Sequence, residues 1–199
     1  MIDIKQSMRD ILEAESRAIQ NIPVTDGYEQ AIQLIVEAKN RGGKLVTSGM
    51  GKCGQIAENI ATTFCSTGVP AVFLHPSEAQ HGDLGILQPA DVMLLLSNSG
   101  KTSEIVALVS LAKELYPQLR FIVITGRADS PLAQESDICL LTSASPEVCP
   151  LGLTPTTSTT MMTVMGDVLV VNTMLVTGFT RQQYALRHHG GYLGEKSRR

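Results

Sequence analysis

A hydroxyl-rich segment follows a strongly apolar run in the middle of the chain. The segment is SNSGKTSE at residues 97–104, and the run before it is VMLLL at residues 92–96. If a strand ends and a helix begins here, the free N–H groups and dipole of the helix favour a bound anion. Helix capping would explain one Ser or Thr, but four hydroxyls suit a phosphate dianion better. We therefore predict phosphate binding by Ser97, Asn98, Ser99, Gly100, Thr102 and Ser103.

A second glycine-rich segment, SGMGKCG at residues 48–54, contains the pattern G-x-G-x-x-G. This pattern occurs in dinucleotide-binding proteins, which also carry an acidic residue at the end of the next strand. The next apolar run ends at His75 instead, and Lys52 places a cation in the turn. The spacing leaves two interpretations open. One is a tight turn with an exposed lysine, and the other is a contact of Gly49 and Lys52 with a charged substrate.

Two histidines and two acidic residues lie close together at residues 75–84, with the sequence HPSEAQHGDL. Such side chains are metal ligands, but their spacing is not that of a recognised zinc motif. Because the segment accompanies a phosphate loop, we expect His75 and His81 to contact the substrate.

Two further segments carry ionisable side chains late in the chain. Glu147 follows the last predicted strand and precedes a hydroxyl-rich run at residues 154–160. From the pattern alone this carboxylate could equally be a solvated group at the start of a buried helix. His188 begins the segment HHGG, which by composition is a flexible tail.

The elements that must position these residues alternate between strand and helix. The predicted strands are 44–47, 71–74, 92–96, 121–124 and 138–141, the predicted helices between and after them are 55–66, 103–115 and 156–176, and two more helices are expected within residues 1–41. Continuous apolar strands alternating with helices predict an α/β fold, a parallel sheet covered on both faces. Right-handed crossovers make it doubly wound, with ligands beyond the carboxyl ends of the strands.

Composition narrows the class of protein. The chain has 199 residues, 43% apolar and 18% charged, with a net charge of -3, which suits one globular domain and argues against a nucleic-acid partner. Residues 1–9 are polar and the four cysteines form no C-x-x-C pair, so we expect a cytoplasmic protein with reduced thiols. The apolar stretch 161–178 contains Asp167 and Asn172, so we expect a buried helix and no membrane association.

Together the segments resemble the D-arabinose 5-phosphate isomerase family. The matching strings are GMGKCG (49–54), HPSEAQHGDLGIL (75–87), SNSGKTSEI (97–105), VITGR (123–127), CPLGLTPTTSTT (149–160), VMGD (164–167) and HHGG (188–191). The resemblance covers the chain after about residue 25. It implies a sugar isomerase (SIS) domain over residues 1–199, with a doubly wound, flavodoxin-like sheet of five parallel strands, a helical segment at 1–41 and a short tail at 188–199.

The resemblance also implies a reaction. Family members interconvert D-arabinose 5-phosphate and D-ribulose 5-phosphate through an enediol, a step toward the sugar acid Kdo of lipopolysaccharide and some capsules. Glu147 resembles the base that shuttles the proton, and His188 the histidine that assists ring opening or proton transfer to oxygen. Lys52 would offset negative charge, and Glu104 would position Lys52 or a substrate hydroxyl. No cofactor is implied and no metal is required, although His75 is a candidate ligand for inhibitory zinc.

The chain departs from the family pattern at several points. Many members continue into a pair of CBS modules, which we do not expect in this chain, and it carries Cys53 where Ser is usual, Lys101 where Glu is usual and His189 where Pro is usual. We also expect a homo-oligomer, a tetramer, in which His188 completes the site of a neighbouring chain. Three alternatives stay open: isomerisation of another sugar phosphate such as sedoheptulose 7-phosphate, a non-catalytic SIS module that senses a sugar phosphate, and a dinucleotide-dependent oxidoreductase, which the missing acid disfavours.

Overall fold

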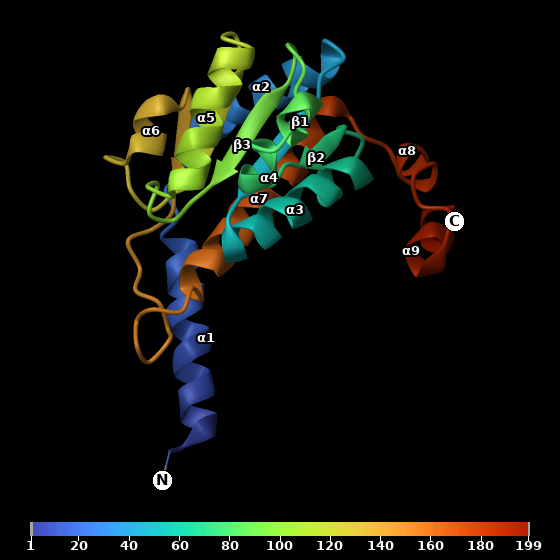
Figure 1. The fold of residues 1–199 in the computed structure, drawn as a ribbon. Coiled ribbons are helices and arrows are strands. Elements are labelled where there is room, and N and C mark those ends of the chain that lie inside the picture. Colours follow the sequence, from blue (N-terminus) through green and yellow to red (C-terminus); the bar gives the residue numbers. More distant parts are fainter. Residues whose placement is uncertain (1, 199) are drawn as a thin grey trace.

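The computed structural model describes residues 2–198 and contains one five-stranded sheet (Figure 1). The strands are β1 (Leu45–Gly49), β2 (Ala71–Phe73), β3 (Val92–Leu96), β4 (Arg120–Thr125) and β5 (Ile138–Leu141). They lie in the order β2-β1-β3-β4-β5, and every neighbouring pair is parallel. This is the flavodoxin-like order, so the predicted doubly wound α/β fold is confirmed.

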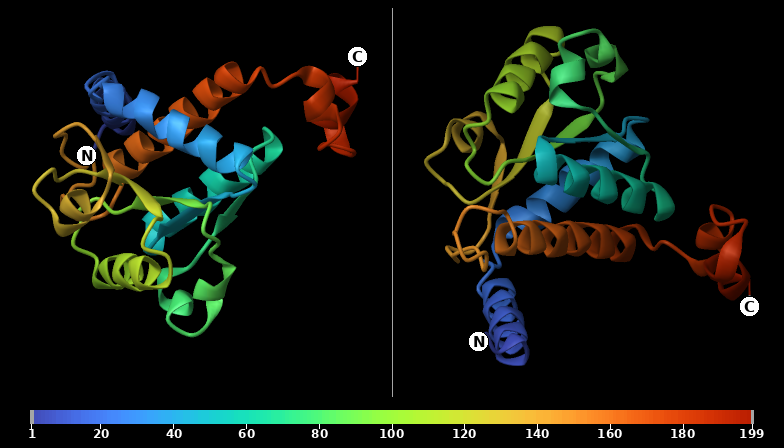
Figure 2. Two further views of the ribbon diagram at one scale, coloured as in Figure 1. Left: turned by 90° about the horizontal axis from the view of Figure 1, so that it is seen from above. Right: turned by 60° about the horizontal axis from the view of Figure 1, so that its bottom comes forward.

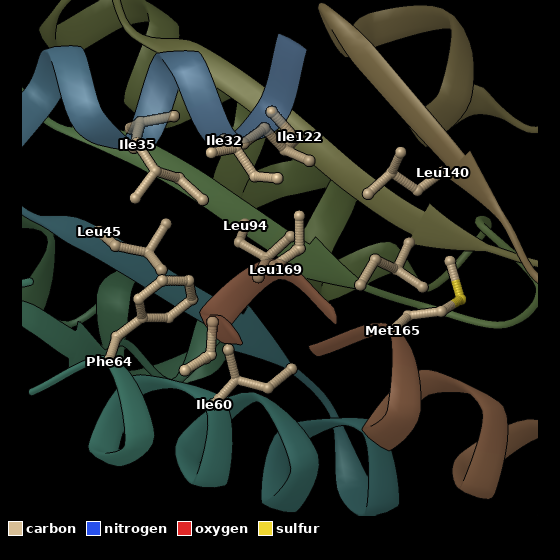
Figure 3. Close-up of a cluster of buried hydrophobic side chains, with 14 of the residues drawn as sticks. Ile32, Ile35, Leu45, Ile60, Phe64, Leu94, Ile122, Leu140, Met165 and Leu169 are labelled. Carbon is tan, nitrogen blue, oxygen red and sulfur yellow. The ribbon is translucent and has the colours of Figure 1, made fainter. Parts of the chain in front are cut away.

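Helices cover both faces of the sheet (Figure 2). The first face packs against α2 (Asp26–Asn40), α3 (Gly51–Ser66) and α7 (Thr157–Thr177), and the second against α4 (Pro76–Ala79), α5 (Ser103–Leu115) and α6 (Pro131–Glu135). Strand β3 divides its side chains accordingly. Leu94 and Leu96 join the core of the first face, shown in Figure 3, whereas Met93 and Leu95 join the core of the second. This two-residue alternation explains why the buried strand is apolar throughout.

Helix α7 is long and apolar enough to meet the length and composition criteria for a membrane span. In the structure it is a core helix, because Met162, Met165 and Leu169 are buried in the core on the first face of the sheet. Gly166 lets α7 approach α3 closely. A Cβ atom at this position would lie 2.6 Å from the Cδ1 atom of Ile60, so the VMGD string has a packing explanation.

Both ends of the chain extend away from the sheet (Figures 1 and 2). Helix α1 (Ile4–Gln20) buries only Ala18, while Ile4, Met8 and Leu12 are 57–68% exposed. At the other end, α8 (Arg181–Ala185) and α9 (Gly191–Ser197) pack on each other beyond the end of α7. The two predicted N-terminal helices are therefore confirmed, but much of the apolar stripe on the first is uncovered in one chain.

The predicted elements differ from the observed ones mainly at short segments. Helix α3 begins at residue 51, four residues before the predicted start, because the glycine-rich segment forms its first turn. The segment 75–87 contains α4 and the 3-10 helix η1 (Asp83–Ile86), and the C-terminal tail contains α8 and α9. These helices have only four to seven residues, too few to show a helical period in the sequence.

Candidate active site

The loop between β3 and α5, residues 97–102, is called the phosphate loop below. It folds so that its hydroxyl groups meet: the Ser97 and Thr102 hydroxyl oxygens are 2.9 Å apart, and the Gly100 N–H donates to Ser97 Oγ at 3.1 Å. Thr102 is the N-cap residue of α5, yet its side chain makes no capping hydrogen bond. Two of the hydroxyl groups singled out from the sequence, those of Ser97 and Thr102, thus meet at the helix N-terminus.

Gly100 is required by the geometry of this loop. Its φ angle is +61°, and a Cβ atom there would lie 2.0 Å from Ser130 Oγ and 2.4 Å from Ser130 Cβ. The Gly100 carbonyl also accepts a hydrogen bond from Leu132 N at 3.2 Å, at the start of α6. The phosphate loop is therefore held against the segment that follows β4, and a larger residue at position 100 does not fit.

The first turn of α5 already stabilises an anionic group. Ser103 Oγ donates to Glu104 Oε2 at 2.9 Å. The pKa of Glu104 lies below its usual value, chiefly because its own backbone N–H donates to it and secondly because Ser103 does. Among residues 2–198, Glu104 makes no ion pair with Lys52, so the predicted positioning of Lys52 by Glu104 is not seen as a direct contact.

Gly49, at the end of β1, and Gly54, in the first turn of α3, allow the strand and the helix to pack closely. A Cβ atom at Gly49 would lie 2.8 Å from the Cys53 carbonyl oxygen, and one at Gly54 would lie 2.7 Å from the Gly49 oxygen. The structure thus accounts for the G-x-G-x-x-G pattern without a dinucleotide. Lys52 is exposed and lines a polar groove of about 260 Å³ between α3 and α7, together with Thr159, Thr160 and Thr163.

Cys53 connects the phosphate loop to Glu147. Burial raises the pKa of the Cys53 thiol, a hydrogen bond from the Asn98 N–H opposes that shift, and the negative charge of Glu147 adds to it. The Cys53 sulfur also lies 3.8 Å from the sulfur of Met162 in α7. Asn98 therefore contacts Cys53, and the charge of Glu147 acts on the same thiol, so the predicted phosphate loop and the predicted base are linked electrostatically.

Glu147 sits at the N-terminus of α7. Its Oε2 atom accepts hydrogen bonds from Thr156 N (2.7 Å), Thr156 Oγ1 (3.0 Å) and Ser158 N (3.3 Å). Burial acts to raise the Glu147 pKa, but these hydrogen bonds and one from the Ser158 side chain outweigh it, so the pKa is below its usual value. The helix N-terminus therefore keeps this carboxylate ionised.

The two histidines of segment 75–84 differ in their surroundings. His81 is exposed, whereas His75 is half-buried, packs edge-on against Phe73 and has a buried Nδ1 atom without a hydrogen-bond partner. No hydrogen bond within the described chain joins either histidine to the phosphate loop. No group of three or more His, Cys, Asp or Glu side chains among residues 2–198 is arranged to hold a metal ion.

His188 lies far from Glu147 in the same chain. It stands between α8 and α9, stacks on Tyr184 at 3.7 Å between ring centroids, and its Nδ1 atom lies 3.0 Å from the Tyr184 carbonyl oxygen. Glu147 is at the start of α7, and His188 is beyond its other end (Figure 1). One chain therefore does not bring these two residues together.

The structure adds residues that the sequence interpretation did not assign. Thr156 and Ser158 hold Glu147, and the hydroxyl run 154–160 was the signal for them. Cys149 has its pKa lowered to about 6 by hydrogen bonds from the Thr154 side chain and then from the N–H groups of Leu153, Thr154 and Leu151. No sequence signal distinguished this thiol, because its donors come from the conformation of a loop.

Comparisons with known proteins show which family the chain resembles. Arabinose 5-phosphate isomerase KdsD of Shigella flexneri is 43% identical over 98% of this chain, which spans only 58% of that relative. A crystal structure of a proposed phosphosugar isomerase involved in capsule formation from Bacteroides fragilis is 67% identical, with a TM-score of 0.93 over 95% of this chain and 99% of that one. An E. coli CFT073 protein in complex with arabinose 5-phosphate is 36% identical, with a TM-score of 0.83 over 93% and 95%. The sequence model of the SIS domain family matches residues 38–172, and the chain therefore belongs to this family.

Proposed function

We propose that the chain is an aldose–ketose isomerase that interconverts D-arabinose 5-phosphate and D-ribulose 5-phosphate. The observation that carries this proposal is the electrostatic link between Glu147 and the phosphate loop: the Asn98 N–H donates to the Cys53 thiol, and the negative charge of Glu147 acts on the same thiol. The curated relatives named arabinose 5-phosphate isomerase and the E. coli complex with arabinose 5-phosphate support this substrate. The chain spans about 58% of the length of those curated relatives. They therefore support the choice of substrate but say nothing about how activity is regulated.

In this proposal the phosphate loop binds the 5-phosphate, and Glu147 acts on the other end of the sugar. The carboxylate takes the proton from C2 of the aldose, an enediol forms between C1 and C2, and the same carboxyl group returns the proton to C1 to give the ketose. Glu147 is ionised before substrate binds, and its low pKa favours return of the proton to carbon. Lys52 would offset negative charge on the enediolate. The reaction needs no redox cofactor.

We further propose that the active form is a homotetramer with shared sites. His188 is separated from Glu147 within one chain, and the tail that carries it packs mainly on itself. In a closed symmetric assembly His188 of the partner subunit can reach the carboxyl ends of the strands, where it would assist ring opening or move the proton between O1 and O2. His75 and His81 would contact the sugar chain from the segment after β2.

The proposed setting is the cytoplasm, where the reaction would feed synthesis of Kdo for lipopolysaccharide or capsule. The B. fragilis relative is described as involved in capsule formation, which favours a role in capsule synthesis. A sensing module without catalysis is the alternative. It would need the phosphate loop but would have no use for a carboxylate held as Glu147 is held.

The test is turnover of pentose, hexose and heptose phosphates by the purified protein, followed by NMR. We expect D-arabinose 5-phosphate and D-ribulose 5-phosphate to interconvert, and unphosphorylated D-arabinose to be a poor substrate. The double variant Ser99→Ala with Thr102→Ala should raise KM strongly. Binding of the pentose phosphate without turnover would favour the sensing module, and turnover of a heptose phosphate alone would reassign the substrate.

A further inference from the structure

A second polar cavity adjoins the phosphate loop and has no role in the mechanism above. It has a volume of about 440 Å³ and lies over the ends of β3, β4 and β5. Asn98 of the phosphate loop forms one side, and the other polar side chains that line it are Arg127, Thr142, Ser143, Ser145 and Ser158. This volume falls within the range typical of small-molecule sites, which is about 300–1,000 Å³.

Arg127 is the one ionisable group in the lining of this cavity. Within residues 2–198 its guanidinium makes neither an ion pair nor a hydrogen bond, and the lining contains no Asp or Glu to neutralise it. Arg120, at the start of β4, is instead paired with Asp137 at 2.6 Å. An unpaired guanidinium in a hollow favours a carboxylate or phosphate, which it can bind through two parallel hydrogen bonds.

The hydroxyl groups that line the cavity together with Arg127 are held in place by the fold. Ser143 and Ser145 hydrogen-bond to each other at 2.7 Å, and Ser143 Oγ also donates to the Ala18 carbonyl of α1 at 3.0 Å. Ser158 is 4% exposed and is bonded through its N–H to Glu147. Hydroxyl groups both donate and accept, so this wall suits a hydroxylated carbon chain.

The cavity and the phosphate loop are within reach of one ligand. The Gly126 N–H donates to the Asn98 carbonyl at 3.0 Å, and Thr125 Oγ1 approaches the same oxygen at 3.3 Å. The residue that follows Gly126 is Arg127, so the backbone of Arg127 is held beside the phosphate loop.

We propose that this cavity is a subsite in which Arg127 binds a second anionic group, a carboxylate or a phosphate, on a polyhydroxylated chain whose 5-phosphate occupies the phosphate loop. The position of the 5-phosphate rests on the function proposed above. Sugar derivatives with an anionic group at both ends therefore bind more tightly than sugar monophosphates and inhibit the isomerase.

Calorimetric titration with ligands that cannot react tests this subsite. D-arabinitol 5-phosphate is the singly anionic reference, and D-arabinitol 1,5-bisphosphate and D-arabinonate 5-phosphate carry a second phosphate or a carboxylate. We expect the protein to prefer a doubly anionic ligand by about tenfold or more, the usual value of a charge-assisted hydrogen bond. Comparison of the two doubly anionic ligands shows which group the subsite takes.

Two variants of Arg127 and one control define the outcome. Arg127→Gln should abolish the preference while leaving the affinity for D-arabinitol 5-phosphate unchanged, and Arg127→Lys should retain part of it. Arg41→Gln, which removes a cation at the C-cap of α2 near the amino ends of β3 and β4, should retain the full preference. Arg127 is exposed, so matching melting curves are expected for the variants.

Two results would overturn the inference. Either the preference survives in Arg127→Gln, or the variant weakens the monophosphate as much as the doubly anionic ligands, which would assign Arg127 to the 5-phosphate itself. Failure of the proposed function is a separate result. If D-arabinitol 5-phosphate does not bind although an Arg127-dependent affinity for doubly anionic ligands persists, the subsite stands and the isomerase proposal falls.

Discussion

Three hydrogen bonds from the start of α7 end on a single oxygen of Glu147. Two come from backbone N–H groups that a helix N-terminus leaves without an intrahelical partner, so the carboxylate caps the N-terminus of α7. The same contacts orient the carboxyl group toward one place and keep it charged. A solvated glutamate at the start of a helix, the alternative left open by the sequence, would not have its neighbours arranged in this way.

Replacing Glu147 by Gln should abolish turnover while largely preserving ligand binding. The amide keeps the shape and can still accept hydrogen bonds, but it cannot take a proton from carbon. We expect kcat to fall by about 10²–10⁴-fold, with the affinity for D-arabinitol 5-phosphate measured by calorimetry. Glu29→Gln, at an exposed position of α2, is the matched control. Near-normal kcat in Glu147→Gln would remove this residue from the catalytic role.

The Glu147 carboxylate should also contribute a pH-dependent term to the free energy of unfolding. Its folded-state pKa is below the ordinary value of about 4.3, so ionisation stabilises the fold above that pH. The stabilisation is lost as pH falls through the folded-state pKa. In urea denaturation, wild type should therefore be more stable than Glu147→Gln at pH 7, and the difference should shrink below about pH 4. A difference that grows in acid would contradict the hydrogen-bonded, ionised state.

Cys149 should be the most reactive of the four cysteines. With a pKa of about 6, set first by the Thr154 hydroxyl and then by backbone N–H groups, it is mainly thiolate at pH 7. Burial raises the pKa of Cys53 and of Cys139, so these serve as internal controls. Brief treatment with iodoacetamide followed by peptide mass spectrometry should show Cys149 labelled first, with its rate falling as pH drops through about 6. A Thr154→Val variant should slow the reaction, and equal labelling of Cys53 would count against this account.

The turn between β3 and α5 depends on Gly100 for two separate reasons, and a pair of variants separates them. Gly100→Ala meets both an unfavourable φ of +61° and the Ser130 side chain at 2.0 Å, whereas Gly42→Ala meets φ +81° with nothing within 4 Å. We expect unfolding to cost about 1–2 kcal/mol less for Gly42→Ala and about 2–5 kcal/mol less for Gly100→Ala, which adds overpacking. Chemical denaturation measures both. Only the second should also raise KM, and equal losses would show that the contact with Ser130 relaxes freely.

Helices and strands could be predicted from the sequence wherever the pattern of apolar residues was long enough. The bounds of β3, α5 and β5 match their predictions, since unbroken apolar runs of strand length and a regular helical stripe leave few alternatives. The phosphate loop was likewise visible as hydroxyls placed between such elements. The low Glu147 pKa was not, because it depends on donors nine to eleven residues away, at Thr156 and Ser158, whose approach only a folded loop determines. The sequence did not predict a role for Arg127, because that role depends on a guanidinium without an ion-pair partner, and only the folded structure shows which groups are paired.

The arrangement of the whole chain leaves apolar helix surface uncovered at both ends. Ile4, Met8 and Leu12 on α1 are more than half exposed, as are Leu175 and Val176 at the end of α7. Helix α1 projects from the domain, and the end of α7 extends past the sheet toward the C-terminal helices (Figure 2). Burial of such side chains is worth about 1.5–3 kcal/mol each, which favours association of chains through these helices. Association would also give His188 a role that its own chain does not offer it.

Mixing two inactive variants tests whether sites are shared between chains. Glu147→Gln retains His188 and His188→Ala retains Glu147, so neither homo-oligomer has a complete site. After the subunits exchange, a site that takes Glu147 from one chain and His188 from another can regain both residues, and with random exchange about a quarter of shared sites should do so under the symmetry of a closed oligomer. If each site drew both residues from one chain, every chain would stay defective and no activity would return. Exchange is verified by mass spectrometry of differently tagged chains, and light scattering gives the oligomeric state. Lack of recovery despite verified exchange would show that His188 of another chain does not complete the site, and a monomer at working concentration would exclude the assembly altogether.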